Sequence, residues 1–321
     1  LFYNEKTAML AGRLALRTHF ERVFLSNSGA EANECLIKTA RKWASDTKGE
    51  GEHPFVTLVN SFHGRTLTTV TATGQDTFHK FFGPFTPGFR YVPASDLAAL
   101  ERQLDAEDCS AVLVEIVQGE GGVRALDADY LKAVEALCHE KNVLFCVDEV
   151  QTGNGRTGTW FAYEQFGLSP DLVSTAKGLG NGLPIGATLM GSKTAEVLTP
   201  GTHGSTFGGN PVACAGALSV LEQIDDAFLE AVKQKGAWLT AELEKIPGVK
   251  DVSGLGLMLG FSVEGCKSAD IKAKALDNGL VVLTAKDRVR LLPPLAITEE
   301  ELSDGLLRLA AAIREVQEAA H

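Results

Sequence analysis

The chain has 321 residues, of which 45% are hydrophobic and 22% are charged, and its formal net charge is −11. These proportions exclude a disordered or fibrous chain and indicate a globular protein large enough for one large and one small domain. Lysines and arginines are scattered singly and no apolar run reaches the roughly 20 residues of a membrane span, so we expect neither nucleic acid nor a membrane as a partner.

The cysteines indicate the compartment. They are spread widely, without a C-x-x-C pair, at Cys35, Cys109, Cys138, Cys146, Cys214 and Cys266. Most lie in apolar runs, which is typical of buried reduced thiols, so we expect a cytoplasmic protein without a zinc site. No signal peptide opens the chain, and it begins at Leu1 without an initiator methionine. We therefore expect it to be the ordered part of a longer protein.

Apolar runs of strand length alternate with amphipathic stretches through the first two thirds of the chain. The runs cover residues 22–27, 55–60, 111–118, 143–150, 171–176 and 185–191. They are rich in Val, Leu, Ile and Phe, as strands buried on both faces are. The stretches 30–44 and 128–140 predict helices. This alternation predicts an α/β fold, with a mostly parallel sheet flanked by helices in a large domain of residues 1–225.

The pattern changes after about residue 225. Helices are predicted at 228–246 and 299–319, and short strands around "GLGLMLGFSV" and "GLVVL". This is typical of a smaller α+β domain, residues 226–321. Ligands of open parallel sheets bind beyond the carboxyl ends of the strands, so the residues that follow each strand are the candidates for a site.

The first strand is followed by Ser28-Gly29-Ala30-Glu31, which opens a helix. Free backbone N–H groups at a helix N-terminus, with a glycine for close approach, form an anion site suited to phosphate. A capping box between Ser28 and Glu31 explains the same residues without a ligand. The stretch is neither a P-loop nor a strand-linked G-x-G-x-x-G.

The next two strands are followed by an aromatic ring, an arginine and carboxylates. Phe62 and Arg65 suit a flat heteroaromatic ligand and a carboxylate, respectively, although Phe62 also suits plain core packing. Glu115 lies within the strand at 111–118, and Glu120 lies in the glycine-rich loop "GEGGV". A loop carboxylate is usually just solvated.

Asp148 ends the very apolar strand at 143–150. A carboxylate there is costly to bury unless it faces a cation or strong donor, so Asp148 needs a partner. The pleat points Asp148 and Glu149 to opposite faces and no histidine lies near them in sequence, which argues against a metal.

The stretch "DLVSTAKGLGNGLPIGA" places Lys177 among small residues. We expect its amine to be confined, and a confined amine tends to lose its proton and become a nucleophile. A snorkelling lysine at a strand end is the plainer alternative. The cofactor pyridoxal 5′-phosphate would use all of these features together: the phosphate site, the stacking ring, the buried carboxylate and this lysine. The lysine would form a Schiff base with its aldehyde, and Asp148 would keep the pyridine nitrogen protonated.

The same residues carry a resemblance that runs in order along essentially the whole chain. The motifs are "LFYNEK", "FLSNSGAEANE", "SFHGRT", "FHKFFGPFTPGFRYVP", "VEIVQGEGGV", "VDEVQTGNGRTG", "STAKGLGNGLPIGA", "HGSTFGGNP" and "RLLPPLAIT". In these the chain resembles the class III aminotransferases, and within them the acetylornithine type. The resemblance implies fold type I of the pyridoxal-phosphate-dependent transferases and a homodimer with shared active sites. Family members usually carry a further segment before the equivalent of "LFYNEK", which contributes to the substrate pocket.

The resemblance also implies roles for individual residues. Lys177 and Asp148 are the implied catalytic residues. The implied cofactor contacts are Ser28, Gly29, Ala30, Phe62, Asp148, Val150, Gln151, Lys177 and, for the partner subunit's cofactor, Thr206. The implied substrate contacts are Arg65 for a distal carboxylate, Ser205, Arg290 for the α-carboxylate of glutamate or 2-oxoglutarate, and Glu120, which masks Arg290 while an ω-amine reacts.

The implied reaction moves the terminal amino group of N2-acetylornithine to 2-oxoglutarate in arginine biosynthesis. Ornithine, 4-aminobutyrate or succinyl-diaminopimelate as donor would use the same residues. An aminomutase or decarboxylase would have less use for Glu120 with Arg290, and a non-enzymatic relative would tolerate loss of Lys177 or Asp148. A nucleotide-dependent oxidoreductase fits the α/β pattern but lacks its glycine fingerprint.

Overall fold

The computed structural model describes residues 3–105 and 108–319, so the first two residues of "LFYNEK" lie outside the described part. The chain divides into two compact units. The first comprises Leu1–Ile116, Leu126–Asn154 and Phe161–Asp225, and the second Val117–Ala125, Gly155–Trp160 and Asp226–His321. None of the helices in the described residues is both long and apolar enough to cross a membrane.

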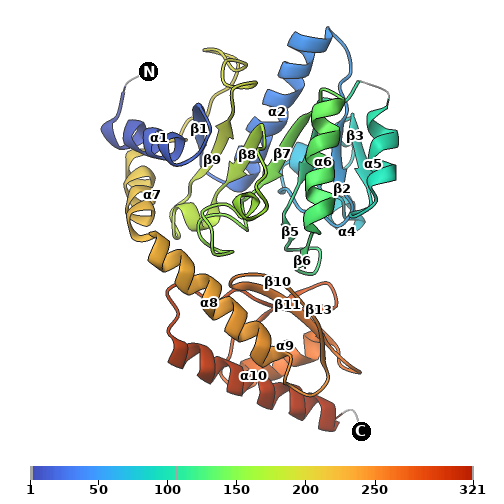
Figure 1. Ribbon diagram of the computed structural model, residues 1–321, viewed down its shortest axis with the longest axis vertical. Coiled ribbons are helices and arrows are strands. Elements are labelled where there is room, and N and C mark those ends of the chain that lie inside the picture. The colour runs from blue at the N-terminus through green and yellow to red at the C-terminus, as the bar shows by residue number, and fades with distance from the viewer. Residues whose placement is uncertain (1–2, 106–107, 320–321) are drawn as a thin grey trace. The chain divides into compact units, whose positions relative to one another are not determined.

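A mixed sheet forms the centre of the first unit (Figure 1). In the described residues its strands lie side by side in the order β1 (Arg22–Ser26), β9 (Gly186–Met190), β8 (Leu172–Thr175), β7 (Leu144–Asp148), β4 (Ala111–Val114), β2 (Phe55–Leu58) and β3 (Phe89–Val92). The pairs from β8 to β3 are all parallel, whereas β9 is antiparallel to both of its neighbours. The prediction of a mostly parallel sheet is therefore confirmed.

Helices flank this sheet. They are α1 (Glu5–Arg17), α2 (Gly29–Lys48), α3 (Leu67–Ala72), α4 (Asp76–His79), α5 (Leu97–Leu104), α6 (Ala128–Glu140) and α7 (Pro211–Gln223), with the 3-10 turns η1 (Ala162–Phe166) and η2 (Lys177–Leu179). Long α2 packs across β1, β8 and β9, and α6 packs on β7 (Figure 1). Side-chain caps begin both: Ser28 accepts from the third amide of α2, and Asp127 accepts from the amides of Asp129 and Tyr130.

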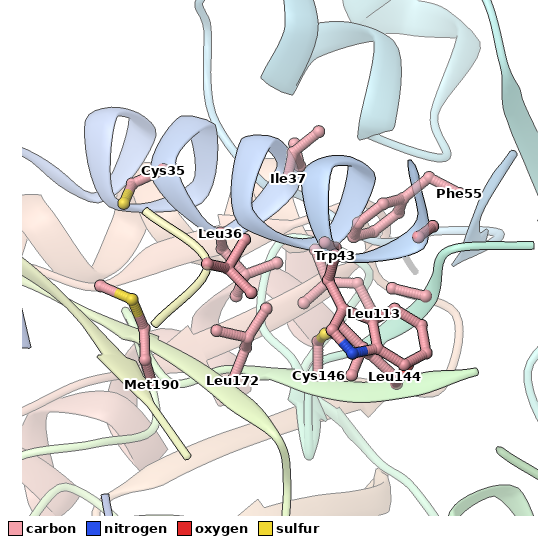
Figure 2. Packing of buried hydrophobic residues seen from close by; sticks show 14 of the residues in the cluster. Cys35, Leu36, Ile37, Trp43, Phe55, Leu113, Leu144, Cys146, Leu172 and Met190 are labelled. Atoms are coloured by element: carbon pink, nitrogen blue, oxygen red, sulfur yellow. The ribbon is translucent and has the colours of Figure 1, made fainter. Parts of the chain in front are cut away.

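The apolar face of α2 fills the space above the strands. Figure 2 shows Leu36 and Trp43 of the helix turned toward Leu172, Leu144 and Cys146 of the sheet. These side chains are almost completely buried. Burial of a side chain of this size contributes about 1.5–3 kcal/mol, so this core fixes the helix, and with it the helix N-terminus, over the sheet.

The second unit is an α+β structure around an antiparallel sheet. Its strands in the described residues lie in the order β10 (Val249–Leu255), β11 (Met258–Val263), β13 (Arg288–Leu291) and β12 (Leu283–Ala285). A separate pair joins β5 (Val117–Gln118) to β6 (Arg124–Ala125). The helices are α8 (Asp226–Leu243), α9 (Ser268–Asp277) and α10 (Glu299–Ala319).

Some predicted strands differ from the observed ones. The run 111–118 is interrupted, because β4 ends at Val114 and Glu115 turns its carboxylate to accept the backbone N–H of Phe62 at 3.0 Å. Residues 279–282 of "GLVVL" are outside strands, and β12 begins only at Leu283. "GLGLMLG" is a hairpin between β10 and β11 whose Gly256 has φ +55°, a conformation that favours glycine.

Candidate active site

A cavity of about 570 Å³ opens in the first unit beside the carboxyl ends of β7 and β8. Nine of the candidate residues line it: Ser28, Gly29, Ala30, Phe62, Arg65, Asp148, Val150, Gln151 and Lys177. They come from four separate stretches of the chain. The sheet topology therefore gathers at one place side chains that the sequence holds far apart.

The N-terminus of α2 forms one wall of this cavity. Ser28 Oγ accepts the backbone N–H of Glu31 at 3.2 Å, as in a capping box. The expected return bond goes one residue earlier, because the Glu31 carboxylate accepts the backbone N–H of Asn27 at 2.6 Å. An added Cβ at Gly29 would lie 2.6 Å from Cγ1 of Val150. Only glycine fits here, and the first amides of the helix suit an anion.

Asp148 is 4% exposed and is held by three donors. Its Oδ2 accepts from Asn33 Nδ2 at 2.7 Å and from His63 Nδ1 at 2.8 Å. Its Oδ1 accepts the backbone N–H of Val150 at 3.0 Å. The partner expected for Asp148 is therefore the side-chain amide of Asn33 together with the imidazole of His63, neither of which was named from the sequence. Asn33 carried a detectable signal, since it lies on the buried face of α2 beside Leu36.

The two buried carboxylates at the end of β7 have different surroundings. Asp148 lines the cavity, whereas Glu149 does not. Glu149 accepts from Thr152 Oγ1 at 2.5 Å and from the backbone N–H of Tyr163 at 2.9 Å. Burial raises the pKa of Glu149 to about 7, although these hydrogen bonds oppose the shift. No group of three or more His, Cys, Asp or Glu residues in the described ranges could hold a metal ion.

The ring of Phe62 is half-buried and belongs to a cluster. It meets the ring of Phe78 edge-on with centroids 5.2 Å apart. The guanidinium of Arg65 lies 5.7 Å from the centroid of Phe62 and 4.9 Å from that of Phe78. Buried Glu115 holds the backbone N–H of Phe62 and also lines the cavity. Phe62 is therefore placed from behind by Phe78 and Glu115, two roles that sequence reasoning missed.

Lys177 stands at the edge of the cavity. The expected confinement of its side chain is wrong, because the residue is exposed although Thr175 and Ala176 before it are buried. It begins the turn η2 with φ +46°, in the left-handed region. The exposure arises because the cavity is open, so the side chain is accessible through the space that a ligand would fill.

Ser205 and Thr206 are not among the residues that line this cavity. Both are exposed and line a second cavity of about 340 Å³ in the first unit, together with Glu34 and His203. Ser205 Oγ accepts from Asn27 Nδ2 at 3.1 Å. The hydroxyl groups of Ser205 and Thr206 therefore line a different surface cavity from the one that Lys177 and Asp148 line.

Glu120 and Arg290 belong to the second unit and contact each other there. Arg290 Nη1 donates to Glu120 Oε1 at 2.6 Å, with the arginine side chain 9% exposed and the carboxylate 30% exposed. Neighbouring Arg288 is fully buried and donates to Ser253 Oγ at 2.8 Å and to the carbonyls of Gly260 and Asp251. The expectation of a solvated loop carboxylate at Glu120 is therefore wrong, because it is half-buried and paired.

The fold and this cavity together define a class of protein: an enzyme with fold type I of the pyridoxal-phosphate-dependent transferases, built around a lysine and a buried carboxylate. The family model for "Aminotransferase class-III" matches residues 1–313. The chain belongs to the class-III aminotransferases, a family that depends on pyridoxal phosphate. The predicted family and fold class are confirmed.

Individual relatives agree with this assignment. The chain is 50% identical over 317 residues to the acetylornithine aminotransferase of Haemophilus ducreyi, covering 98% of this chain and 81% of that protein. It is similar to the solved N-acetylornithine aminotransferase of Stenotrophomonas maltophilia, with 38% identity, TM-score 0.86 and 99% and 82% of the two chains covered. The ornithine aminotransferase of Toxoplasma gondii gives TM-score 0.93 at 37% identity, covering 99% and 78%.

Proposed function

We propose that this chain transfers the terminal amino group of N2-acetylornithine to 2-oxoglutarate, and so acts in arginine biosynthesis in the cytoplasm. The proposal is supported by the 50% identity to a relative that is named an acetylornithine aminotransferase. The observation that carries the chemistry is the cavity where Lys177, Asp148 and the N-terminus of α2 converge.

The residues of this cavity fit pyridoxal phosphate. The amides of Gly29 and Ala30, with Ser28 beside them, suit its phosphate. Phe62 and Val150 suit the two faces of a flat ring, and the fixed carboxylate of Asp148 suits a ring N–H. These side chains all line the same space, which accommodates a ligand of this size.

Gln151 offers one more group for this ligand. It lines the cavity, and its Oε1 is buried without a donor in the described part of the chain. A buried unsatisfied acceptor calls for an explanation, and the phenolic oxygen of the cofactor provides one because it can carry a proton.

The bound cofactor would supply an aldehyde and an electron-withdrawing ring. The Nζ atom of Lys177 would be the group of this chain that meets the aldehyde, and it would then hold and move the proton that transamination transfers. The carboxylate of Asp148 would favour a proton on the ring nitrogen, and Asn33 and His63 hold this carboxylate in place. Phe62 and Val150 would hold the plane of the ring and exclude water from its faces.

Two arginines of the chain are proposed to bind the carboxylates of the substrates. Arg65 would bind the distal carboxylate of the substrate, and Ser205 would lie beside it. Arg290 would bind the α-carboxylate of glutamate or 2-oxoglutarate, as a guanidinium fork suits a carboxylate. Its pair with Glu120 has to open first, because the 2.6 Å contact occupies the fork. While an ω-amine reacts, the closed pair would withhold the charge of Arg290.

The working form is proposed as a homodimer with shared sites. Phe81 is 98% exposed and Phe82, Phe207 and Val212 are also exposed, which indicates a surface that a partner covers. Thr206 would then serve the phosphate of the partner subunit's cofactor. Sedimentation should give twice the mass of the chain, and mixing Lys177→Ala with Thr206→Val protein should restore activity through one intact site.

A half-reaction tests the substrate. Protein loaded with pyridoxal phosphate is mixed separately with N-acetylornithine, ornithine, 4-aminobutyrate and succinyl-diaminopimelate, and loss of the cofactor's absorbance band is followed. N-acetylornithine should react fastest. Ornithine is the second candidate, because of the TM-score of 0.93 with an ornithine aminotransferase. A response to ornithine or 4-aminobutyrate alone would overturn the substrate and leave the chemistry standing.

A further inference from the structure

The peptide that precedes Lys177 is held by two donors. The carbonyl oxygen of Ala176 accepts the backbone N–H of Leu179 at 3.0 Å and Nδ2 of Asn154 at 3.1 Å. The same Nδ2 lies 2.9 Å from Oγ1 of Thr175. Because a peptide unit is planar, fixing its carbonyl also fixes the N–H and Cα of Lys177. The side chain of Asn154 therefore contributes to the direction in which Lys177 leaves the backbone.

Lys177 needs such support. Its φ of +46° lies in the left-handed region, which residues with a Cβ adopt at a cost. A conformation of this kind persists where its surroundings hold it. The neighbouring Gly178 leaves space for the Asn154 side chain, because a Cβ added at Gly178 would lie 3.3 Å from Cβ of Asn154.

The amide of Asn154 is buried and its orientation is determined. A carbonyl oxygen such as that of Ala176 accepts only, so the nitrogen of the amide has to face it. This leaves Oδ1 buried without a donor in the described residues. A buried acceptor without a donor is unfavourable, so an apolar side chain would suit the packing at this position better. The amide is therefore explained by the hydrogen bonds of its nitrogen.

The loop that carries Asn154 is itself fixed, so the asparagine can act as a support. Glu149 anchors the loop through Thr152 Oγ1, and its carbonyl accepts the backbone N–H of Gly153 at 2.9 Å. The loop begins at Asp148 and presents Val150 to the cavity. The segment from Asp148 to Asn154 thus carries the carboxylate, the Val150 side chain that lines the cavity, and the asparagine that bonds the peptide before Lys177.

We infer that Asn154 is a positioning residue for the amine of Lys177, acting through the hydrogen bond to the Ala176 carbonyl. The inference rests on the proposed function, since it assigns Asn154 a part in presenting Lys177 to the cofactor. It differs from a role in local backbone conformation alone. Asn154 itself has φ +58°, and asparagine tolerates this region better than most residues.

Two substitutions separate these roles. Asn154→Gly keeps the left-handed backbone free of strain and removes the side-chain hydrogen bonds. Asn154→Asp keeps the shape but cannot donate to the Ala176 carbonyl. Asn142→Gly is the matched control, because Asn142 has φ +49° in the turn after α6 and is exposed. The measurements are kcat, KM for the amino donor, the dissociation constant of pyridoxal phosphate and Tm.

We expect both Asn154 variants to lower kcat about 10- to 100-fold, the range that a misplaced reacting group costs, with KM within about twofold of wild type. The dissociation constant of pyridoxal phosphate should rise at least about threefold, and Asn142→Gly should match wild type in both. If Asn154→Gly fails to fold, the kcat and the cofactor dissociation constant of Asn154→Asp test the inference.

Wild-type kcat and cofactor affinity in the Asn154 variants, with or without a lower Tm, would overturn the inference and leave the proposed function intact. The proposed function fails separately, if the wild-type protein loaded with pyridoxal phosphate and reduced by borohydride carries no label on Lys177.

Discussion

Two buried charged side chains, Asp148 of the first unit and Arg290 of the second, are held in opposite ways. In the first unit Asp148 is held by N–H donors from Asn33, His63 and a backbone amide. His63 Nε2 is buried without a hydrogen-bond partner in the described residues, so the ring is held by the contact of Nδ1 with Asp148. Asp148 is thus fixed by hydrogen bonds from an amide, an imidazole and the backbone. In the second unit the charge of Arg290 is cancelled by Glu120 of the same chain.

This difference separates a fixed site from a switchable one. Neutral donors orient a carboxylate and leave its charge for a ligand, so Asp148 is ready before anything binds. An internal ion pair hides its charge until a competing carboxylate opens it, so in the proposed function Arg290 would respond to which substrate is present. A constant cofactor suits the first arrangement, and two alternating substrates suit the second.

The largest test removes the central group of the fixed site. Lys177→Ala should lower kcat by at least about 10³-fold, because no other group would hold the transferred proton at that place. Since Lys177 is exposed, Tm should stay within about 2 °C of wild type. Steady-state kinetics and calorimetry check this. Retention of more than a tenth of the wild-type kcat would contradict the account.

The switchable pair should show its effect in one half-reaction. Arg290→Ala should raise KM for 2-oxoglutarate about 100-fold, because a charged hydrogen-bonded pair with the carboxylate is lost. The half-reaction with N-acetylornithine should change less than about twofold. Glu120→Gln should instead lower KM for 2-oxoglutarate, since Arg290 is then unmasked. Equal losses in both half-reactions would show that Arg290 has no selective role.

Glu149 sharpens the comparison through pH. Its pKa is raised to about 7 by burial, above the value of an unfolded glutamate. The folded state then holds a proton that the unfolded state has released, so stability is fully present below about pH 4.5 and is lost as pH rises through about 7. The loss should reach roughly 3–4 kcal/mol in urea unfolding, from a shift of pKa from 4.5 to about 7. Glu149→Gln should lack this slope, and the exposed control Glu140→Gln should keep it. Parallel curves for all three proteins would refute the buried titration.

The smallest expected effect concerns the support of Asp148. His63→Phe removes one of three donors, and hydrogen bonds to charged groups contribute about 1.5–3 kcal/mol, so kcat should fall about tenfold or more. His79→Phe is the control, because the ring of His79 bonds the carbonyl of Val70 and does not line the cavity. It should change kcat less than about twofold. Equal effects of the two substitutions would remove the special role of His63.

Much of the fold could be predicted because local signals and packing agree. Helix α6 runs from Ala128 to Glu140 and α10 from Glu299 to Ala319, as the amphipathic pattern indicates. The mostly parallel order follows from alternating strands and helices. The strand end before Glu115 lies inside a continuous apolar run, and the carboxylate there bonds Phe62, 53 residues away, a contact that no local pattern indicates.

The site was predicted less evenly. Residues that follow strands could be found, because parallel strands end at one edge of the sheet. The supports of those residues could not, since Asn33 and His63 meet Asp148 across 115 and 85 residues of chain. The exposure of Lys177 was also beyond sequence reasoning, since small neighbours describe the backbone and not the open cavity beside it.

The central claim is that the amine of Lys177 is the group that meets the cofactor aldehyde in the fixed site. Borohydride reduction of protein loaded with pyridoxal phosphate, followed by peptide mass spectrometry, tests it directly. The account predicts one pyridoxyl group per chain, on the peptide that contains Lys177. A label on another lysine, or no label in protein that binds the cofactor, would contradict it.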